Sequence, residues 1–207
     1  MQRIKKRTNA KDLSPKYDLI VLVNNSGAIF DTKTEVLSEH VKQGRGVLGV
    51  HAALACFLDG QDSVGGTPMK ATWPFIEELF GAHFKNHPPP QEGTVHVNQQ
   101  YAQKYPTLKE LPETFQHFDE FFNFSGNPAE IEDVEILATV DEKTYEGGSM
   151  GSNCVHPIVW CRHWGENRAP IFYCALGHFT DEYNEGASGR VKSFLRLGIE
   201  FCMKRNQ

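Results

Sequence analysis

The sequence predicts an α/β fold with a mostly parallel β-sheet and helices on both of its faces. Two short, almost continuous apolar runs, at residues 17–24 and 46–50, have the length and β-branched content of buried parallel strands. Each run is followed by a segment that favours a helix. Strands alternate with helices early in the chain and come closer together later, which is the order typical of such a sheet.

The remaining elements are expected from spacing and from start and stop residues. Asp31 or Thr32 can cap a first helix that Gly44 ends. Further helices are expected to begin at residues 52, 73 and 189, the last with one broad apolar face. The other expected strands are residues 94–98, 134–140, 156–161 and 170–176.

Length and composition indicate one globular domain. The chain has 207 residues, of which 40% are hydrophobic, so it can bury a core without disulfides or metals. We expect a polar N-terminal tail at residues 1–16 and a single domain at residues 17–207. The tail begins with a basic stretch, for which a nuclear signal is the alternative to an ordinary solvated tail.

Charge and cysteine usage exclude several classes of protein. The net charge is −5, which argues against a general nucleic-acid binder. No apolar run approaches the length of a membrane span, and the N-terminus lacks the apolar stretch of a signal peptide. The five cysteines form no CxxC pair, which suits reduced thiols. We therefore expect a cytoplasmic protein with neither a nucleic-acid nor a membrane partner.

The first candidate site residue is His51, which follows the strand at 46–50. In sheets of this class the ligand site lies outside the carboxyl ends of the strands, so the residues after each strand matter most. The segment GVHAA passes from strand to helix through small residues, as a nucleophile elbow does. A histidine there suits proton transfer or metal binding near neutral pH, and a buried structural histidine is the alternative.

The second candidate is His178, which lies just past the strand at 170–176, on the same rim as His51. Gly177 permits a close backbone approach beside it. Asp181 or Glu182 is positioned to orient the imidazole, as partners of general bases and metal ligands do. A helix cap is the alternative role for Asp181.

The third candidate is the segment at 117–124, in which aromatic residues alternate with acids and an amide. This composition suits a sugar site, where rings cover apolar sugar faces and polar groups hold hydroxyls; amphipathic packing is the alternative. Asp119 and Glu120 are consecutive and therefore point in different directions, so at most one of them is expected to face the site.

A divalent metal such as zinc is the one cofactor considered. Two His-Pro steps place His87 and His156 in extended loops, from which imidazoles could converge with His51 and His178 on one ion. No tight ligand spacing such as HExxH occurs, and surface loop histidines are the alternative. Nucleotide-binding glycine motifs and GxSxG are absent as well.

Taken together, short motifs along the chain resemble the ThuA-like (trehalose-utilisation) family. They follow the family's order and span nearly the whole chain. They are YDLIVL at 17–22, GVLGVHAA at 46–53, FGAHF at 80–84, DEFFNF at 119–124, LATVDE at 137–142, HPIVW at 156–160 and ALGH at 175–178.

The resemblance implies a three-layer, flavodoxin-like fold related to the class I glutamine amidotransferases. In those relatives a cysteine occupies the elbow where this chain has His51, and the catalytic histidine falls near His178. The resemblance thus implies that glutaminase chemistry has been abandoned. It also implies a role in the use of trehalose and other disaccharides, including oxidised 3-keto sugars.

The resemblance further implies that the first strand is missing. Family members usually begin with another strand and helix, near the sheet's centre, where this chain has only 16 polar residues. The chain is then a shortened form or a partial gene model, or another segment replaces the strand. Because unpaired buried backbone groups are costly, we expect a destabilised protein or a homo-oligomer.

The sequence therefore predicts a protein of carbohydrate metabolism, an enzyme acting on a disaccharide or glycoside by histidine acid–base or metal-assisted chemistry. A non-catalytic sugar-binding or regulatory domain is the alternative, and the histidine at the elbow argues against a residual amidotransferase or peptidase. The expected catalytic residues are His51 and His178 with Asp119 or Glu120, and the expected substrate contacts are Asn25, Trp73, Asn123 and Asp181.

Overall fold

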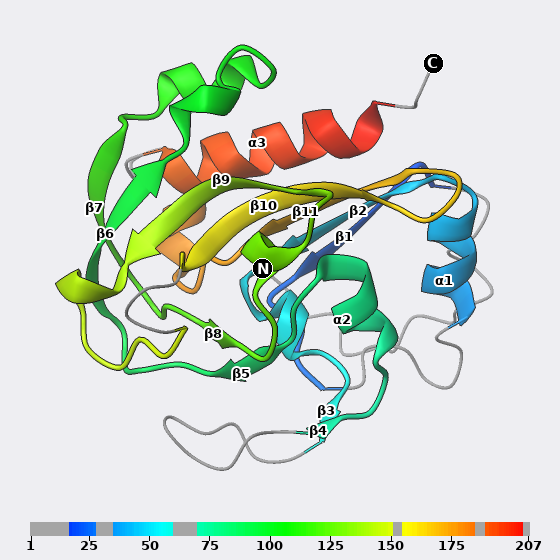
Figure 1. Cartoon of the computed structure of the whole chain (residues 1–207), viewed down its shortest axis with the longest axis horizontal. Helices are drawn as coiled ribbons and strands as arrows, with labels where there is room; N and C mark the ends of the chain where they lie inside the picture. Colours follow the sequence, from blue (N-terminus) through cyan, green and yellow to red (C-terminus); the bar gives the residue numbers. More distant parts are fainter. Residues whose placement is uncertain (1–16, 28–34, 60–69, 151–154, 185–188, 205–207) are drawn as a thin grey trace.

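A seven-stranded sheet forms the centre of the molecule (Figure 1). The computed structural model describes residues 17–27, 35–59, 70–150, 155–184 and 189–204, and the statements below concern these residues. In spatial order the strands are β1 (Leu19–Val23), β2 (Gly46–Val50), β11 (Ala169–Cys174), β10 (Pro157–Trp164), β9 (Val134–Asp141), β6 (Gln91–Val97) and β7 (Thr114–Asp119).

The predicted α/β class is confirmed, with a sheet that is mixed. Strands β1, β2 and β11 run parallel to one another. The pairings from β11 through β10, β9 and β6 to β7 are all antiparallel. The parallel part is thus smaller than the sequence suggested. It contains the two strands after which His51 and His178 were expected to meet.

Helices cover both faces of the sheet, as predicted. Helix α3 (Arg190–Met203) lies along one face (Figure 1), where its Gly198 approaches Leu48 and Phe172. On the other face, α2 (Phe75–Phe80) places the ring of Phe80 beside Gly49. Because successive strand residues point to opposite faces, these contacts require two separate layers. A further helix, α1 (Glu35–Lys42), contacts β2.

The sheet has no vacant central position within the described residues. Strand β2 pairs directly with β1 on one side and with β11 on the other. The expectation of a missing strand near the centre is therefore wrong for this sheet, and a further strand could pair only beyond β1 or β7. Strand β1, at one end of the sheet order, leaves Val21 45% and Val23 39% exposed.

Local structure departs from expectation after His51 and along residues 114–124. The expected helix after β2 is a short 3-10 helix, η2 (His51–Ala55). Strand β7 was not predicted, although its residues alternate between exposed and buried. The starting cap of α1 lies outside the described residues.

Short elements complete the described structure. The small strands are β3 (Leu58–Asp59), β4 (Lys70–Ala71), β5 (Phe84–Asn86) and β8 (Asn123–Phe124). The other 3-10 helices are η3 (Gln99–Tyr101), η4 (Pro106–Glu110), η5 (Pro128–Glu130), η6 (Glu142–Thr144) and η7 (Thr180–Tyr183).

The cysteines that the structure describes are core residues with free thiols, as the reduced pattern predicts. Burial raises the pKa of Cys56 and of Cys161 to about 12, so neither thiol is a ready nucleophile. Cys154 lies outside the described residues. Among the helices of the described residues, none combines the length and the apolar character that crossing a bilayer requires.

The contact between β2 and the end of α3 predicts that Gly46→Ala is destabilising. A Cβ at residue 46 would lie 2.3 Å from the backbone oxygen of Cys202 and 2.8 Å from its Cβ. Backbone must shift to admit the methyl group, at a cost of about 1–3 kcal/mol in the free energy of unfolding. Urea titration measures this change. Gln43→Ala, an exposed change nearby, serves as the control, and equal midpoints for the two variants would contradict the prediction.

Candidate active site

The site is organised around His51, whose backbone makes a sharp turn between β2 and η2. Its φ is +46°, in the left-handed region that residues other than glycine rarely adopt. Two hydrogen bonds from β11 and the residue after it hold this turn. The Tyr173 hydroxyl donates to the carbonyl oxygen of His51 at 2.7 Å, and His51 Nδ1 lies 2.7 Å from the carbonyl oxygen of Ala175.

The contact with Ala175 determines which nitrogen of His51 is available. A carbonyl oxygen can only accept a hydrogen bond, so Nδ1 carries the proton and donates it. In the neutral ring Nε2 then has a free lone pair. A backbone carbonyl on the far nitrogen is the usual partner of a histidine that acts as a metal ligand or a base.

The lone pair of His51 faces Glu120 and His178, which the chain brings together from distant segments. The distance from His51 Nε2 to His178 Nδ1 is 3.3 Å, and that to Glu120 Oε2 is 3.5 Å. His178 Nδ1 lies 3.0 Å from the same carboxylate oxygen. The two imidazoles that the sequence placed on one rim therefore meet, with a carboxylate between them.

The three atoms offer a place for a cation. If His178 Nδ1 donates its proton to Glu120, the lone pair of His51 Nε2 and the carboxylate face each other as two acceptors at 3.5 Å. A proton or a metal ion between them would be bound by both acceptors. Burial disfavours an unpaired charge on either His51 or Glu120, because their side chains are only 3% and 14% exposed.

The spacing of the cluster fits a metal ion with room for another ligand. Ligand atoms about 2.1 Å from a zinc ion, at angles between octahedral and tetrahedral, lie roughly 3.0–3.4 Å apart. The three observed separations are 3.0, 3.3 and 3.5 Å. Two histidines and one carboxylate are also a ligand set used by catalytic zinc sites, which keep a further position open for water or substrate.

Glu120 is held as a carboxylate by the surrounding histidines. Burial by itself would raise the pKa of Glu120, but the neighbouring imidazoles of His51, His87 and His178 outweigh it, so the pKa is lowered. His87 lies at the edge of the cluster, with Nδ1 3.8 Å from Glu120 Oε1 and 2.9 Å from the carbonyl oxygen of Pro88.

Asp119, next to Glu120, points the other way and joins the two segments of the site. It is fully buried. Its Oδ1 accepts from the backbone N–H of Glu120 at 2.8 Å, and its Oδ2 accepts from that of Gly177, also at 2.8 Å. The residue that precedes His178 is thereby fixed to the residue that supplies the carboxylate. Asp119 is a positioning residue rather than a member of the cluster.

A buried ion group lies behind Asp119. His117 Nε2 is 3.2 Å from Glu182 Oε2 and 3.5 Å from Asp119 Oδ2. Burial alone would lower the pKa of His117, but the hydrogen bonds and charges of the two carboxylates outweigh it and raise the pKa to about 9. Glu182 also accepts from the backbone N–H of Phe179, so this group holds the segment on both sides of His178.

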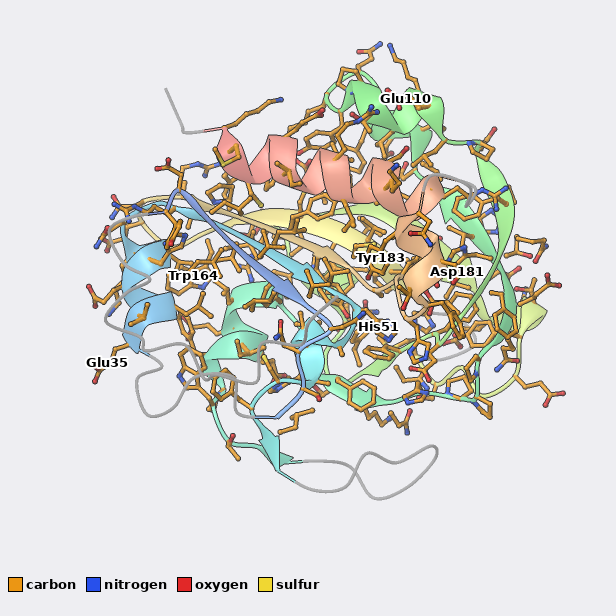
Figure 2. All side chains as sticks on the ribbon, turned by 180° about the vertical axis from the view of Figure 1, so that it is seen from behind. Glu35, His51, Glu110, Trp164, Asp181 and Tyr183 are labelled. Atoms are coloured by element: carbon orange, nitrogen blue, oxygen red, sulfur yellow. The ribbon has the colours of Figure 1, made fainter. Side chains whose placement is uncertain are left out.

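Gly177 is fixed by two further hydrogen bonds to its carbonyl oxygen. The Asn24 side chain donates at 3.0 Å and the Tyr183 hydroxyl at 2.6 Å. Gly177 has a φ of +115°, and a Cβ there would lie 2.3 Å from the Tyr183 hydroxyl. Only glycine fits this position, where the chain leaves the sheet and carries His178 back toward His51. Figure 2 shows His51, Tyr183 and Asp181 at the same end of the sheet, away from Trp164.

Two expected residues lie outside the cluster with their polar atoms already bonded. His156 contacts Glu142 and the Tyr145 hydroxyl through Nδ1 and the carbonyl oxygen of Phe122 through Nε2. Both ring nitrogens are thus occupied, so the proposed convergence of His156 with His51 is not found. The Asn123 side chain donates hydrogen bonds to Asn86 and Gly147 and accepts one from the backbone N–H of Ser149. It therefore joins separate segments of the chain rather than facing a substrate.

The remaining expected substrate contacts have no bond to the cluster in the described residues. Trp73 packs between Phe57 and Phe75. Asn25 is half-buried beside Asn24, and it is the Asn24 side chain that donates to the carbonyl oxygen of Gly177. Asp181 is exposed on η7. A hollow of about 780 Å³ is lined by residues of β6 and β9 and by His156, and not by the His51 cluster.

The model of the trehalose-utilisation family, ThuA, matches residues 5–202. The chain belongs to the ThuA family. The match covers the three segments that carry the site, those of His51, Glu120 and His178. A search among curated proteins finds no match.

Solved structures support the same fold for this ThuA-family chain. A ThuA-like protein from Bacteroides uniformis is 23% identical, with a TM-score of 0.68 over 96% of this chain and 74% of the other. One from Parabacteroides merdae is 24% identical, with a TM-score of 0.65 over 95% and 74%. A Salmonella typhimurium protein described as cytoplasmic is 13% identical, with a TM-score of 0.58 over 96% and 77%. At these identities the likeness extends to the fold alone.

Sequence reasoning missed the residues that support the site. His117, Tyr173 and Tyr183 act through backbone groups or other side chains, and nothing in their local sequence announces this. The alternation of β7 was the one available signal, because it places His117 and Asp119 on the same buried face.

The raised pKa of His117 predicts a loss of stability at alkaline pH. The folded pKa of about 9 lies above the unfolded value of about 6.5, so the ion group stabilises fully below pH 6.5 and the effect is lost as the pH rises through 9. The change is on the order of 3 kcal/mol in the free energy of unfolding. Urea titrations at several pH values should show it in the wild type.

His117→Gln provides the comparison, because it removes the titrating group and keeps a hydrogen-bonding side chain. The free energy of unfolding of the wild type should exceed that of this variant at low pH, and the difference should disappear between about pH 6.5 and 9. His96→Gln, at an exposed histidine on β6, should keep the wild-type dependence. A difference between the wild type and His117→Gln that stays constant across this range would contradict the assignment.

Proposed function

We propose that the protein is a carbohydrate-processing enzyme that uses a divalent metal ion, such as zinc, bound by His51, Glu120 and His178. The convergence of two imidazole nitrogens and one carboxylate oxygen within 3.5 Å carries this proposal. The set contains the nitrogen and oxygen ligands that zinc prefers. Membership of the trehalose-utilisation family supports a carbohydrate, with disaccharides or glycosides, including 3-keto derivatives, as the substrate class.

The chain's own residues have separable tasks in this proposal. The carbonyl oxygen of Ala175 fixes the tautomer of His51 so that Nε2 faces the ion. Asp119 and Gly177 hold Glu120 and His178 at a constant separation. His178, with its side chain 37% exposed, forms the solvent side of the cluster and leaves an approach for a sugar oxygen. A metal bound there supplies polarisation of that oxygen or of a water molecule.

A metal-free enzyme is the second candidate, and the carboxylate–imidazole contact supports it. Without a metal, Glu120 accepts a hydrogen bond from His178 Nδ1, and His51 Nε2 is free to accept a proton from a sugar hydroxyl. A sugar-binding domain without catalytic activity remains the alternative, and it would show binding of a sugar without turnover.

The buried free thiols are in keeping with a cytoplasmic protein.

Zinc binding separates the first two candidates. Calorimetric titration of the metal-free protein should give one zinc ion per chain, with binding lost or weakened at least about tenfold in His178→Ala and Glu120→Gln. His96→Ala removes an exposed histidine outside the cluster and should bind as the wild type does. Absence of zinc binding by the wild type, together with turnover that a chelator does not change, would favour the metal-free enzyme.

Substitution of His51 should abolish turnover without unfolding the protein. His51→Asn is the informative variant, because asparagine tolerates the left-handed backbone of this position. We expect turnover of a disaccharide or 3-keto-disaccharide to fall by about 10²–10⁴-fold, the usual contribution of one positioned catalytic group. Thermal unfolding checks that the variant is folded, and His96→Asn is the control. Wild-type turnover in His51→Asn would remove this residue from the mechanism.

A panel assay decides between an enzyme and a binding domain. Purified protein supplied with zinc is incubated with trehalose, other disaccharides and their 3-keto derivatives, and both binding and product are measured. Product from any of them supports the enzyme. Binding of a sugar without product from the whole panel would support the sugar-binding domain instead.

A further inference from the structure

A row of aromatic rings leads from the molecular surface to the cluster. Phe118 stacks on Phe179 with ring centroids 5.6 Å apart and an interplanar angle of 30°. Phe179 meets His178 edge-on at 4.5 Å, and His178 meets His51 at 5.3 Å. The row ends inside the molecule on Phe122, whose ring centroid is 4.3 Å from that of His51.

The two ends of this row differ in exposure. Phe118 is 51% exposed, an unusual position for a phenylalanine on a strand, whereas His51 is 2% exposed. The alternation of β7 accounts for the direction of the ring. Residues two apart share a face of a strand, so Phe118 points away from the buried face that holds His117 and Asp119. Its ring reaches the cluster through Phe179, which contacts His178.

One carboxylate is paired with Phe118 across the sheet, and another follows Phe179 in the chain. Glu92 on β6 is directly opposite Phe118 in the antiparallel pairing, and side chains of such a pair lie on one face. Asp181, exposed on η7, follows Phe179 by two residues. An apolar platform with carboxylates at its border has the composition of a small-molecule site, in which rings supply contact area and a few polar groups supply orientation.

We propose that Phe118 and Phe179 form an aromatic subsite that stacks on the second sugar ring of a disaccharide while the first ring occupies the His51–Glu120–His178 cluster. This inference rests on the proposed function and adds the part of the substrate that the cluster does not touch. A sugar ring has an apolar face that fits an aromatic ring and hydroxyls at its edge that suit Glu92 and Asp181. The subsite therefore selects a substrate of two rings over a substrate of one.

Binding of trehalose and of glucose tests the subsite without requiring turnover. Calorimetry with zinc present should show that Phe118→Ala raises the dissociation constant for trehalose about three- to tenfold, the contribution expected from one aromatic contact. The dissociation constant for glucose should stay unchanged, and Phe118→Tyr should bind trehalose as the wild type does. Ile199→Ala, which removes a comparably exposed apolar side chain from α3, is the matched control.

The outcomes distinguish this inference from the proposed function. If the wild type binds trehalose and Phe118→Ala binds it equally well, the subsite is wrong and the proposed function stands. If the wild type binds neither sugar and turns over none of the disaccharide panel, both are overturned. Sedimentation of the wild type and of Phe118→Ala tests the remaining possibility, that a second copy of the chain packs on these aromatic rings. A dimer that Phe118→Ala converts to a monomer, with trehalose affinity unchanged, would assign the ring to self-association.

Discussion

The hydrogen bond between His51 Nδ1 and the carbonyl oxygen of Ala175 is the interaction on which the site depends. It links the ends of two neighbouring parallel strands, β2 and β11. It also selects the tautomer of His51 and stabilises a left-handed backbone that histidine rarely adopts. Without it, neither the direction of Nε2 nor the sharp turn after β2 would be determined. A strained backbone held by its surroundings is typical of residues at functional sites.

A second, deeper constraint holds the other half of the site. Glu120 and His178 come from segments that Asp119 joins, because it accepts a hydrogen bond from the backbone of each. A fully buried carboxylate is costly unless it is paired, and the charged His117, which also pairs with Glu182, provides the partner of Asp119. The site thus consists of a solvent-facing cluster supported by a buried ion group. This layering explains why Asp119 matters without facing the substrate.

The arrangement also clarifies how the elbow is used in this chain. Small residues after β2 let the backbone turn sharply, and the histidine at the turn projects toward the loop that follows β11. The resemblance to amidotransferase-like proteins implies a cysteine at this position in those relatives. An imidazole in its place offers a lone pair instead of a thiolate, and it is joined here by a second imidazole and a carboxylate. Such a set suits metal binding or proton transfer rather than formation of an acyl intermediate.

The sequence by itself determined the fold class, most of the strands, and the two histidines that meet. Those features follow from local patterns, because a buried strand needs a continuous apolar run and the ligand site of a parallel sheet lies at strand ends. The consecutive Asp119 and Glu120 could also be separated in advance, since neighbouring side chains point apart. Only the tertiary structure decided which of the two joins the cluster.

Tertiary structure likewise decided the roles of His156, Asn123 and His117. Their partners lie far away in the chain and include backbone carbonyls, which carry no sequence signal. The expectation of a missing central strand was wrong for the same reason, because strand order in the sheet is set by pairings over long sequence separations. Local composition indicates what a residue can do chemically. Whether its nitrogen or oxygen atoms are left available depends on contacts that only the folded chain makes.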